Sequence, residues 1–110
     1  VSAESMGSKL TSVGGGQMDF MPAAHASPSG NAIITLKSTA KQKKISRIIA
    51  PMTMCGPVTT HRNWVDFVVT EHGIADLRGA NFKERARRII NVADPIFREE
   101  LAEAAYAVLK

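Results

Sequence analysis

The chain has 110 residues, of which 45% are hydrophobic, and its formal net charge is +4. This length suits one small globular domain, and the apolar runs are too short to span a bilayer, so we expect no membrane partner. The positive charge favours an anionic partner such as a phosphorylated ligand, whereas one Trp and one Tyr provide little stacking surface for nucleic acid. A single cysteine, Cys55, cannot form an internal disulfide; we expect it to be buried, in a cytoplasmic protein.

The first predicted elements are a short strand with a polar loop over residues 1–13 and a helix over residues 17–26. Val1 and Ala3 are typical of the end of a strand, so we expect the chain to be a piece of a longer protein. Between the two elements the backbone is broken by three consecutive glycines: Gly14, Gly15 and Gly16. Because glycine lacks a Cβ, a ligand can approach this turn closely, and amides at the helix start can receive a phosphate or an oxyanion. The alternative is a flexible turn without a ligand.

Three strands are predicted in the middle of the chain, at residues 32–36, 45–50 and 64–70. Each is a run rich in β-branched or aromatic residues between turn residues. The loop after the first strand is basic, and no acid interrupts its five cations: Lys37, Lys41, Lys43, Lys44 and Arg47. We expect a solvated turn and strand edge there, with phosphate contact and nucleic-acid binding as alternatives.

Two helices are predicted to close the chain. Asn81, with Glu84 three residues later, forms the asparagine version of a capping box, and apolar residues then recur at helical spacing as far as Ala93. Asp94 followed by Pro95 marks the start of the second helix. Strands followed by helices indicate an α/β layered structure.

Polar residues flank the third predicted strand, and strand ends are where ligand sites tend to lie in α/β sheets. These residues are His61 and Arg62 before the strand, and Glu71 and His72 after it. A His–Glu pair could perform acid–base chemistry, but we expect Glu71 and Asp76 to act in capping or in pairing with Arg78. No spacing of the HExxH kind occurs, so no metal site is predicted.

Four segments together resemble the C-terminal domain of the acetyl-CoA hydrolase/transferase family. They are residues 14–20 (GGGQMDF), residues 38–40 with 46–48, residues 58–60, and residues 65–79 (VDFVVTEHGIADLRG). Residues 82–101 are similar to the closing helices of the family, and the QMDF and TTHRN segments are most like 4-hydroxybutyrate CoA-transferases. The resemblance implies a NagB/RpiA/CoA-transferase-like α/β fold, a layered sheet with flanking helices, of which residues 1–110 form the C-terminal part.

The resemblance implies a ping-pong transfer of CoA between an acyl-CoA and a small carboxylic acid, of the 4-hydroxybutyrate or acetate type. In this family a glutamate carboxylate becomes a glutamyl-CoA thioester. That glutamate lies upstream and Glu4 does not stand in its context, so we expect no catalytic residue here and no activity from this fragment alone. Coenzyme A is a substrate, and no covalently bound cofactor is implied. The alternatives are an acetyl-CoA hydrolase of the same family and a stand-alone basic α/β module that binds nucleotides or nucleic acid.

The implied partners are an acyl-CoA, a small carboxylate, the missing N-terminal domain and, in the full-length enzyme, a second subunit or more, without nucleic acid. The residues expected to bind CoA or the oxyanion are Gly14, Gly15, Gly16, Gln17, Asn31 and Lys37. Of these, Gly15 is expected to present its amide to the acyl oxygen. Asn31 stands where a Lys or Arg is frequent in the family, and Lys37 where a proline is common. His61 and Arg62 match the substrate-facing loop, and Arg62 is expected to pair with a substrate carboxylate.

Overall fold

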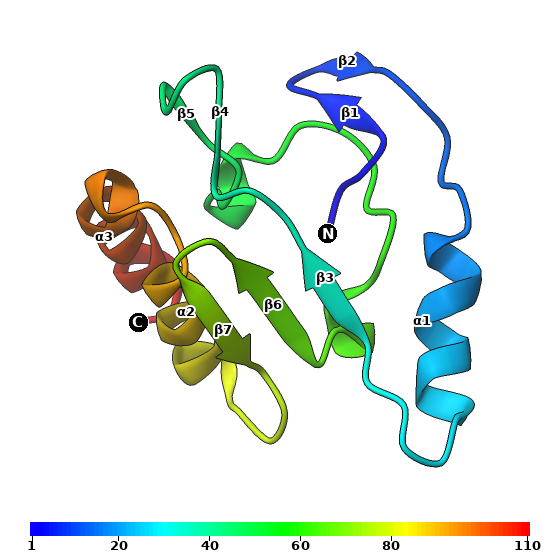
Figure 1. Cartoon of the computed structure of the whole chain (residues 1–110). Helices are drawn as coiled ribbons and strands as arrows, with labels where there is room; N and C mark the ends of the chain where they lie inside the picture. The colour runs from blue at the N-terminus through cyan, green and yellow to red at the C-terminus, as the bar shows by residue number, and fades with distance from the viewer.

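The computed structural model describes residues 1–110 and has a three-stranded sheet at its centre, in the order β3–β6–β7 (Figure 1). Strand β3 (Ile33–Thr35) pairs in parallel with β6 (Phe67–Thr70), which pairs antiparallel with β7 (Gly73–Asp76). The sheet therefore brings a segment from the first third of the chain beside one from the second half. The α/β fold class predicted from the sequence is confirmed.

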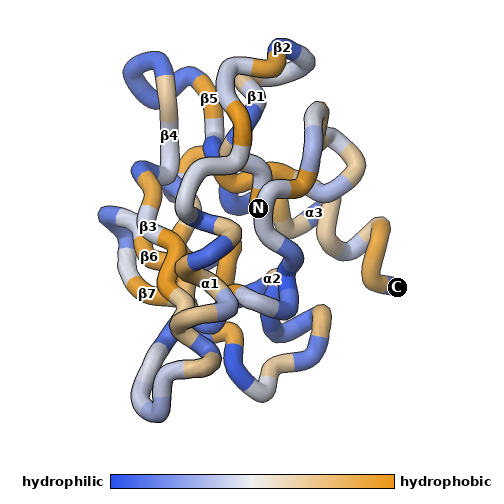
Figure 2. Tube along the Cα trace, turned by 90° about the vertical axis from the view of Figure 1, so that its right-hand side faces the viewer, coloured by the Kyte–Doolittle hydropathy of each residue, from blue (hydrophilic) through white to orange (hydrophobic).

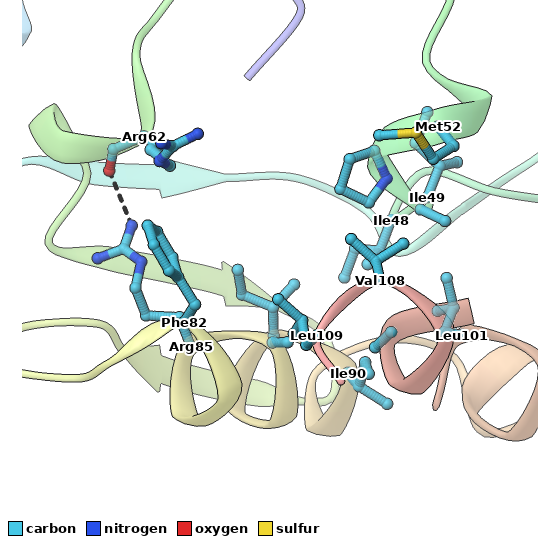
Figure 3. Close-up of a pocket in the computed structure, with 15 residues that line it drawn as sticks. Ile48, Ile49, Met52, Arg62, Phe82, Arg85, Ile90, Leu101, Val108 and Leu109 are labelled. Atoms are coloured by element: carbon cyan, nitrogen blue, oxygen red, sulfur yellow. Dashed lines mark hydrogen bonds between the residues drawn. The ribbon is translucent and has the colours of Figure 1, made fainter. Parts of the chain in front are cut away.

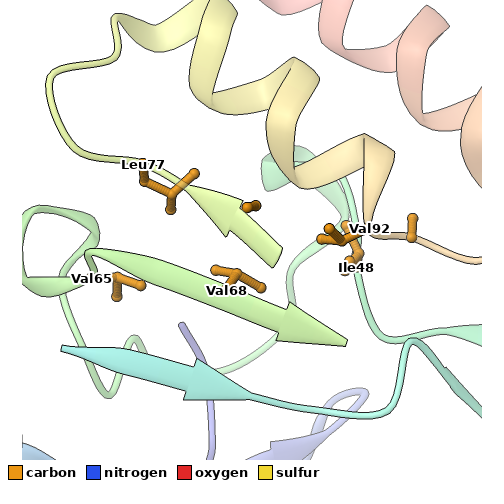
Figure 4. Packing of buried hydrophobic residues seen from close by; sticks show 7 residues of the cluster. Ile48, Val65, Val68, Leu77 and Val92 are labelled. Atoms are coloured by element: carbon orange, nitrogen blue, oxygen red, sulfur yellow. The ribbon is translucent and has the colours of Figure 1, made fainter. Parts of the chain in front are cut away.

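Side chains alternate across β6, as the pleat of a strand requires. Val68 is 8% exposed and belongs to the buried core cluster with Leu77 and Val92, which Figure 4 shows on one side of the sheet. On the same side, the Thr70 hydroxyl donates a hydrogen bond to the carbonyl of Val92 at 2.5 Å. These contacts fasten the end of the following helix to the sheet, so this face carries the core.

The closing helices begin as the sequence predicts. In α2 (Phe82–Asn91), the Asn81 side chain accepts a hydrogen bond from the amide of Glu84 at 3.0 Å, and the Glu84 carboxylate accepts one from the amide of Asn81 at 2.9 Å. Asp94 accepts a hydrogen bond from the amide of Ile96 at 3.1 Å and caps a 3-10 turn, Pro95–Phe97, which continues as α3 (Arg98–Val108). Both N-caps are confirmed, and the second helix starts with a tighter first turn.

The first helix, α1 (Gln17–Ala26), lies beyond β3, whereas α2 and α3 lie beside β7 at the other edge of the sheet (Figure 1). It has its predicted bounds, with Pro22 in its second turn. Its C-terminal end is tied to the segment before β6 by His25, whose Nε2 donates to the carbonyl of Trp64 at 3.0 Å and lies 3.6 Å from the Asp66 carboxylate. Asp66 in turn accepts the amide of Ala32 at 2.8 Å, so one carboxylate joins α1, β3 and β6.

The strand predicted over residues 45–50 is wrong beyond its first two residues. Only β5 (Ile45–Ser46) is extended, and it forms a hairpin with β4 (Thr39–Ala40), which the sequence did not predict. The predicted basic turn closes this hairpin with positive φ angles at Lys41, Gln42 and Lys43. Figure 2 shows this hydrophilic turn at the end of the hairpin, away from the apolar strands of the central sheet. Ile48 then turns into the core, and a 3-10 turn, Pro51–Thr53, follows.

The structure differs from the prediction at four further points. The N-terminal segment is a hairpin of β1 (Ser5–Met6) and β2 (Lys9–Leu10), not a strand and a loop. The third predicted strand begins at Phe67, because a 3-10 turn, Arg62–Trp64, precedes it, and β7 was not predicted at all. Cys55 is exposed, so the prediction that it is buried is wrong. None of the helices has the length and apolar character needed to cross a membrane.

Candidate active site at the glycine turn

The glycine turn leads directly into α1, and no side chain caps this helix at Gly16. The first amides of a helix have no acceptor within the helix, so they remain available to an anion that binds at this end. A Cβ added at Gly15 would have no neighbour within 4 Å, so the space beside this residue is open. An open position beside unsatisfied amides is what a site for a developing oxyanion requires.

Gly14 lies close to side chains of two other segments, and its φ angle is not in the left-handed region. A Cβ at this position would lie 2.7 Å from an Oε1 atom of Glu4 and 3.4 Å from the methyl group of Thr59. The turn is therefore packed between the N-terminal hairpin and the Thr59 loop. No pattern in the sequence indicated that the Glu4 carboxylate lies beside the glycines, because the chain must fold back through the hairpin to bring it there.

Gln17 joins the turn to a second loop. Its Nε2 donates a hydrogen bond of 2.6 Å to the hydroxyl of Thr60, which is 43 residues away in the sequence and 3% exposed. The same loop holds the start of the chain: the amides of Thr59 and Thr60 both donate to the carbonyl of Val1, at 2.9 and 3.1 Å. The glycine turn and the segment that precedes His61 thus form one structural unit.

His61 and Arg62 follow this unit immediately, so the structure brings the predicted substrate loop close to the predicted oxyanion turn. The Nδ1 atom of His61 accepts the amide of Asn63 at 3.2 Å, which caps the 3-10 turn. The Arg62 guanidinium lies over the ring of Phe82, 5.1 Å from its centroid, and has no carboxylate within 4.0 Å. Its positive charge is therefore available to an anion.

Asn31 and Lys37, the two other residues expected to contact CoA, lie at opposite ends of β3. Both are exposed, and no side-chain hydrogen bond or ion pair engages either of them. Asn31 is at the end of the strand near Asp66, and Lys37 is at the end near the β4–β5 hairpin. The structure does not gather them with the glycine turn, and their contact with CoA stays a prediction.

The family model for the acetyl-CoA hydrolase/transferase C-terminal domain matches residues 1–105. The chain belongs to this family. It is 50% identical, over 92% of its length, to 4-hydroxybutyrate coenzyme A transferase of Clostridium kluyveri. It is 48% identical, over 94% of its length, to succinyl-CoA:cyclohexane-1-carboxylate CoA transferase of Geobacter metallireducens. The matched regions are 24% of each of these relatives, so the chain spans about a quarter of their length.

Solved structures support the same relationship. The crystal structure of RipA from Yersinia pestis matches 86% of the chain with a TM-score of 0.79 and 47% sequence identity, over 21% of its own length. The 4-hydroxybutyrate CoA-transferase of Porphyromonas gingivalis matches 80% of the chain with a TM-score of 0.68 and 43% identity, over 21% of its own length. The CoA-transferase type of fold expected from the sequence is thereby confirmed.

In this acetyl-CoA hydrolase/transferase domain, the TEHGIADLRG segment has a structural role. The Glu71 carboxylate accepts hydrogen bonds from the amide of Ser38 at 2.9 Å and from its hydroxyl at 2.8 Å. The amide of Ser38 contributes most to lowering the pKa of Glu71 to about 2. Glu71 is thus ionised at neutral pH and occupied as an acceptor, which argues against a general acid; its contact is a long-range one to Ser38 and neither a helix cap nor a pair with Arg78.

The other acid of the segment behaves as expected. Asp76 accepts a hydrogen bond from the Arg78 side chain at 2.9 Å, and Arg78 lowers the pKa of this carboxyl to about 2. His72 lies 3.6 Å from the buried carboxylate of Asp94, at the start of the last helical segment. The contacts of Glu71 and His72 connect the β6–β7 turn to the rest of the family domain, and the glycine turn remains the candidate reaction site.

Proposed function

We propose that this chain is the C-terminal part of a CoA-transferase that moves CoA between an acyl-CoA and a small carboxylic acid. The acids we propose are of the 4-hydroxybutyrate and acetate type. The identity of half of the aligned residues with a 4-hydroxybutyrate coenzyme A transferase supports this class of reaction. The single structural observation that carries the proposal is the open space at Gly15, in the turn that leads into the uncapped start of α1.

The reaction uses a glutamate on the part of the longer protein outside residues 1–110. Its carboxylate attacks the thioester carbonyl of the acyl-CoA, and the collapse of this adduct gives an acyl–glutamyl anhydride and the CoA thiolate. The thiolate then attacks the glutamyl carbonyl, which forms the glutamyl-CoA thioester and releases the first carboxylate. A second carboxylate repeats the two steps in reverse order and leaves as the new acyl-CoA.

Each attack on a carbonyl carbon places negative charge on an oxygen, and the amides around Gly15 are proposed to stabilise it. A preorganised donor of this kind is worth about 3–4 kcal/mol in other enzymes. The Gln17–Thr60 hydrogen bond holds the turn against the loop that carries Arg62. Arg62 is proposed to receive the carboxylate of the acceptor acid through charge-assisted hydrogen bonds.

The test is made on the full-length enzyme with acetyl-CoA and 4-hydroxybutyrate. We expect 4-hydroxybutyryl-CoA to form with ping-pong kinetics. The change Gly15→Ala places a methyl group in the open space and is expected to lower kcat at least about ten-fold. The control is Val13→Ala, an exposed neighbour in the same loop. Equal activity of the two variants would contradict the role of the glycine turn.

The second candidate is an acetyl-CoA hydrolase, since the family description includes this activity. In that reaction water takes the place of the acceptor carboxylate at the glutamyl-CoA thioester. Release of free CoA from acetyl-CoA at the same rate with and without an acceptor acid would favour the hydrolase. Dependence of the rate on the acceptor would favour the transferase.

A further inference from the structure

A second feature of the domain lies outside the glycine turn: an open apolar groove of about 480 Å³. Its two walls are the α2–α3 pair and residues 48–52, and their apolar side chains face one another across it (Figure 3). The only charged residues that line the groove are Arg62 and Arg85, at one end, and no acid lines it. The groove is therefore apolar along its length and positive at one end.

The walls of the groove expose large apolar side chains to water. Met52 is 78% exposed, Phe82 is 59% exposed and Val108 is 47% exposed. Burial of apolar surface is favourable in water, and contiguous patches of this kind mark sites of association. The hydrophobic effect therefore favours a partner that covers the groove.

Arg85 adds an electrostatic argument. Its guanidinium donates to the carbonyls of Leu77 at 3.1 Å and Arg62 at 2.8 Å, the second of which Figure 3 shows, but no carboxylate lies within 4.0 Å. The side chain is half-buried, so its charge is less screened than that of a surface arginine. A carboxylate from a partner would balance this charge.

We propose that the groove is the docking site of an amphipathic helix that belongs to the longer protein, outside residues 1–110. The helix packs its apolar face between α2, α3 and residues 48–52, and directs a carboxylate to Arg85, which leaves Arg62 to the acceptor acid. This inference rests on the proposal that the chain is part of a longer enzyme. In the relatives, about three-quarters of the chain lies outside the matched region, which provides the segment that covers the groove.

The form of the groove favours a helix over other occupants. Two of its surrounding elements, α2 and α3, pack against each other, and a third helix can place its ridges between theirs. A second copy of this chain is disfavoured, because the net charge of +4 on each copy would be brought together and two positive ends would need acids. The carboxylate is thus expected on a less basic part of the protein.

The first test measures accessibility in the full-length enzyme, with neighbouring residues of α3 as a matched pair. Val108 lines the groove, and Ala107 is exposed and lies outside it. The variants Val108→Cys and Ala107→Cys are labelled with a maleimide, and the rate at each position is read from its own peptide by mass spectrometry. We expect the thiol at position 108 to react at least about ten-fold more slowly than that at position 107, because burial limits thiol access. Equal rates at the two positions overturn the proposal.

The second test identifies the occupant. The photo-crosslinking residue benzoylphenylalanine is incorporated at position 52, which lines the groove at its exposed rim, the enzyme is irradiated, and the captured peptide is sequenced. We expect a helical, apolar peptide that contains an Asp or Glu and comes from outside residues 1–110 of the same protein molecule. Capture from a second molecule, detected by mixing isotope-labelled and unlabelled enzyme, overturns the proposal. Protection that appears only after dodecanoate is added indicates an amphiphile site and also overturns it.

A stability measurement is independent of the labelling chemistry. If a helix covers the groove, Val108→Asp places a carboxylate in a desolvated contact, whereas Ala107→Asp leaves it in water. We expect the Tm of the full-length enzyme to fall about 3 °C further for Val108→Asp. Equal Tm values overturn the docking proposal. Because none of these measurements uses CoA transfer, a failed activity assay leaves their outcome unaffected.

Discussion

The side chain of Gln17 donates a hydrogen bond of 2.6 Å to the hydroxyl of Thr60, across 43 residues of sequence. This contact fastens the start of α1 to the loop that leads to Arg62, and so relates the two parts of the candidate active site. Gln17 follows the glycine turn, and Thr60 is almost fully buried. The relative position of turn and loop therefore depends on a pair of neutral side chains.

We expect the changes Gln17→Ala and Thr60→Val to lower the free energy of unfolding by about 1 kcal/mol each. Because both remove the same hydrogen bond, the double variant should lose less than the sum of the two single losses. Urea denaturation of the four proteins, wild type included, measures this coupling. Additive losses would show that the hydrogen bond does not hold the two segments together.

The exposed charge of Arg62 leads to a prediction about the acceptor acid. In the full-length enzyme, Arg62→Ala should raise the KM for the acceptor carboxylate about ten-fold, because a charge-assisted hydrogen bond contributes about 1.5–3 kcal/mol. The KM for acetyl-CoA should change little. Arg87→Ala is the control. Arg87 is an exposed arginine of α2, and it does not line the apolar groove that Arg62 lines. Initial-rate measurements at varied acceptor concentration give this KM, and an unchanged value would argue against binding of the acceptor carboxylate by Arg62.

The Ser38–Glu71 contact predicts how stability depends on acid. The pKa of Glu71 falls from its ordinary value of 4.5 to about 2 in the folded chain, mainly because the amide of Ser38 donates to its carboxylate. Since the folded state holds the proton less tightly than the unfolded state, this contribution is present above pH 4.5 and is lost as the pH falls towards 2.

The variant Glu71→Gln should therefore show a weaker loss of stability between about pH 5 and pH 2 than the wild type. A smaller dependence should remain, since the pKa of Asp76 is also lowered to about 2 by its contact with Arg78. The control is Glu103→Gln, an exposed position on α3. Thermal unfolding at several pH values gives the comparison, and parallel curves for wild type and Glu71→Gln would contradict the expectation.

The capping box of α2 provides a test of local stability. Asn81→Ala removes the acceptor of the Glu84 amide and should lower the free energy of unfolding by about 1 kcal/mol. Asn91→Ala, at the exposed last residue of the same helix, should change it by less than about 0.5 kcal/mol. Urea denaturation measures both, and similar losses for the two variants would exclude a specific capping effect.

Local signals in the sequence predicted the elements that depend on near neighbours. The bounds of α1 and the caps at Asn81 and Asp94 follow from turn residues and side chains within three positions, and the structure confirms them. The two short hairpins were not predicted, and the strand at residues 45–50 was predicted too long, because their bounds depend on contacts beyond near neighbours. In the β4–β5 hairpin, Ile45 begins an apolar run, but the chain bends at Ile48 because that side chain is buried in the core.

In the candidate site, too, local features were predicted from the sequence and long-range contacts were not. Three successive glycines indicated a place of close approach. In the TEHGIADLRG segment the expected pair between Asp76 and Arg78 formed, whereas Glu71 bonds Ser38, which no local signal indicated. No spacing in the sequence related Gln17 to Thr60 or Glu4 to Gly14, because these contacts are made by segments that meet only after the chain folds back.

By itself, the sequence determined the α/β class, the helix starts and the family resemblance, since these depend on residue type and on spacing over a few positions. Only the tertiary structure decided that the glycine turn and the Arg62 loop are neighbours and that an apolar groove with two arginines lies open beside them. The physical reason is that such contacts join residues far apart in the sequence: Gln17 and Thr60 are 43 positions apart, and Ala32 and Asp66, beside β3 and β6, are 34 positions apart.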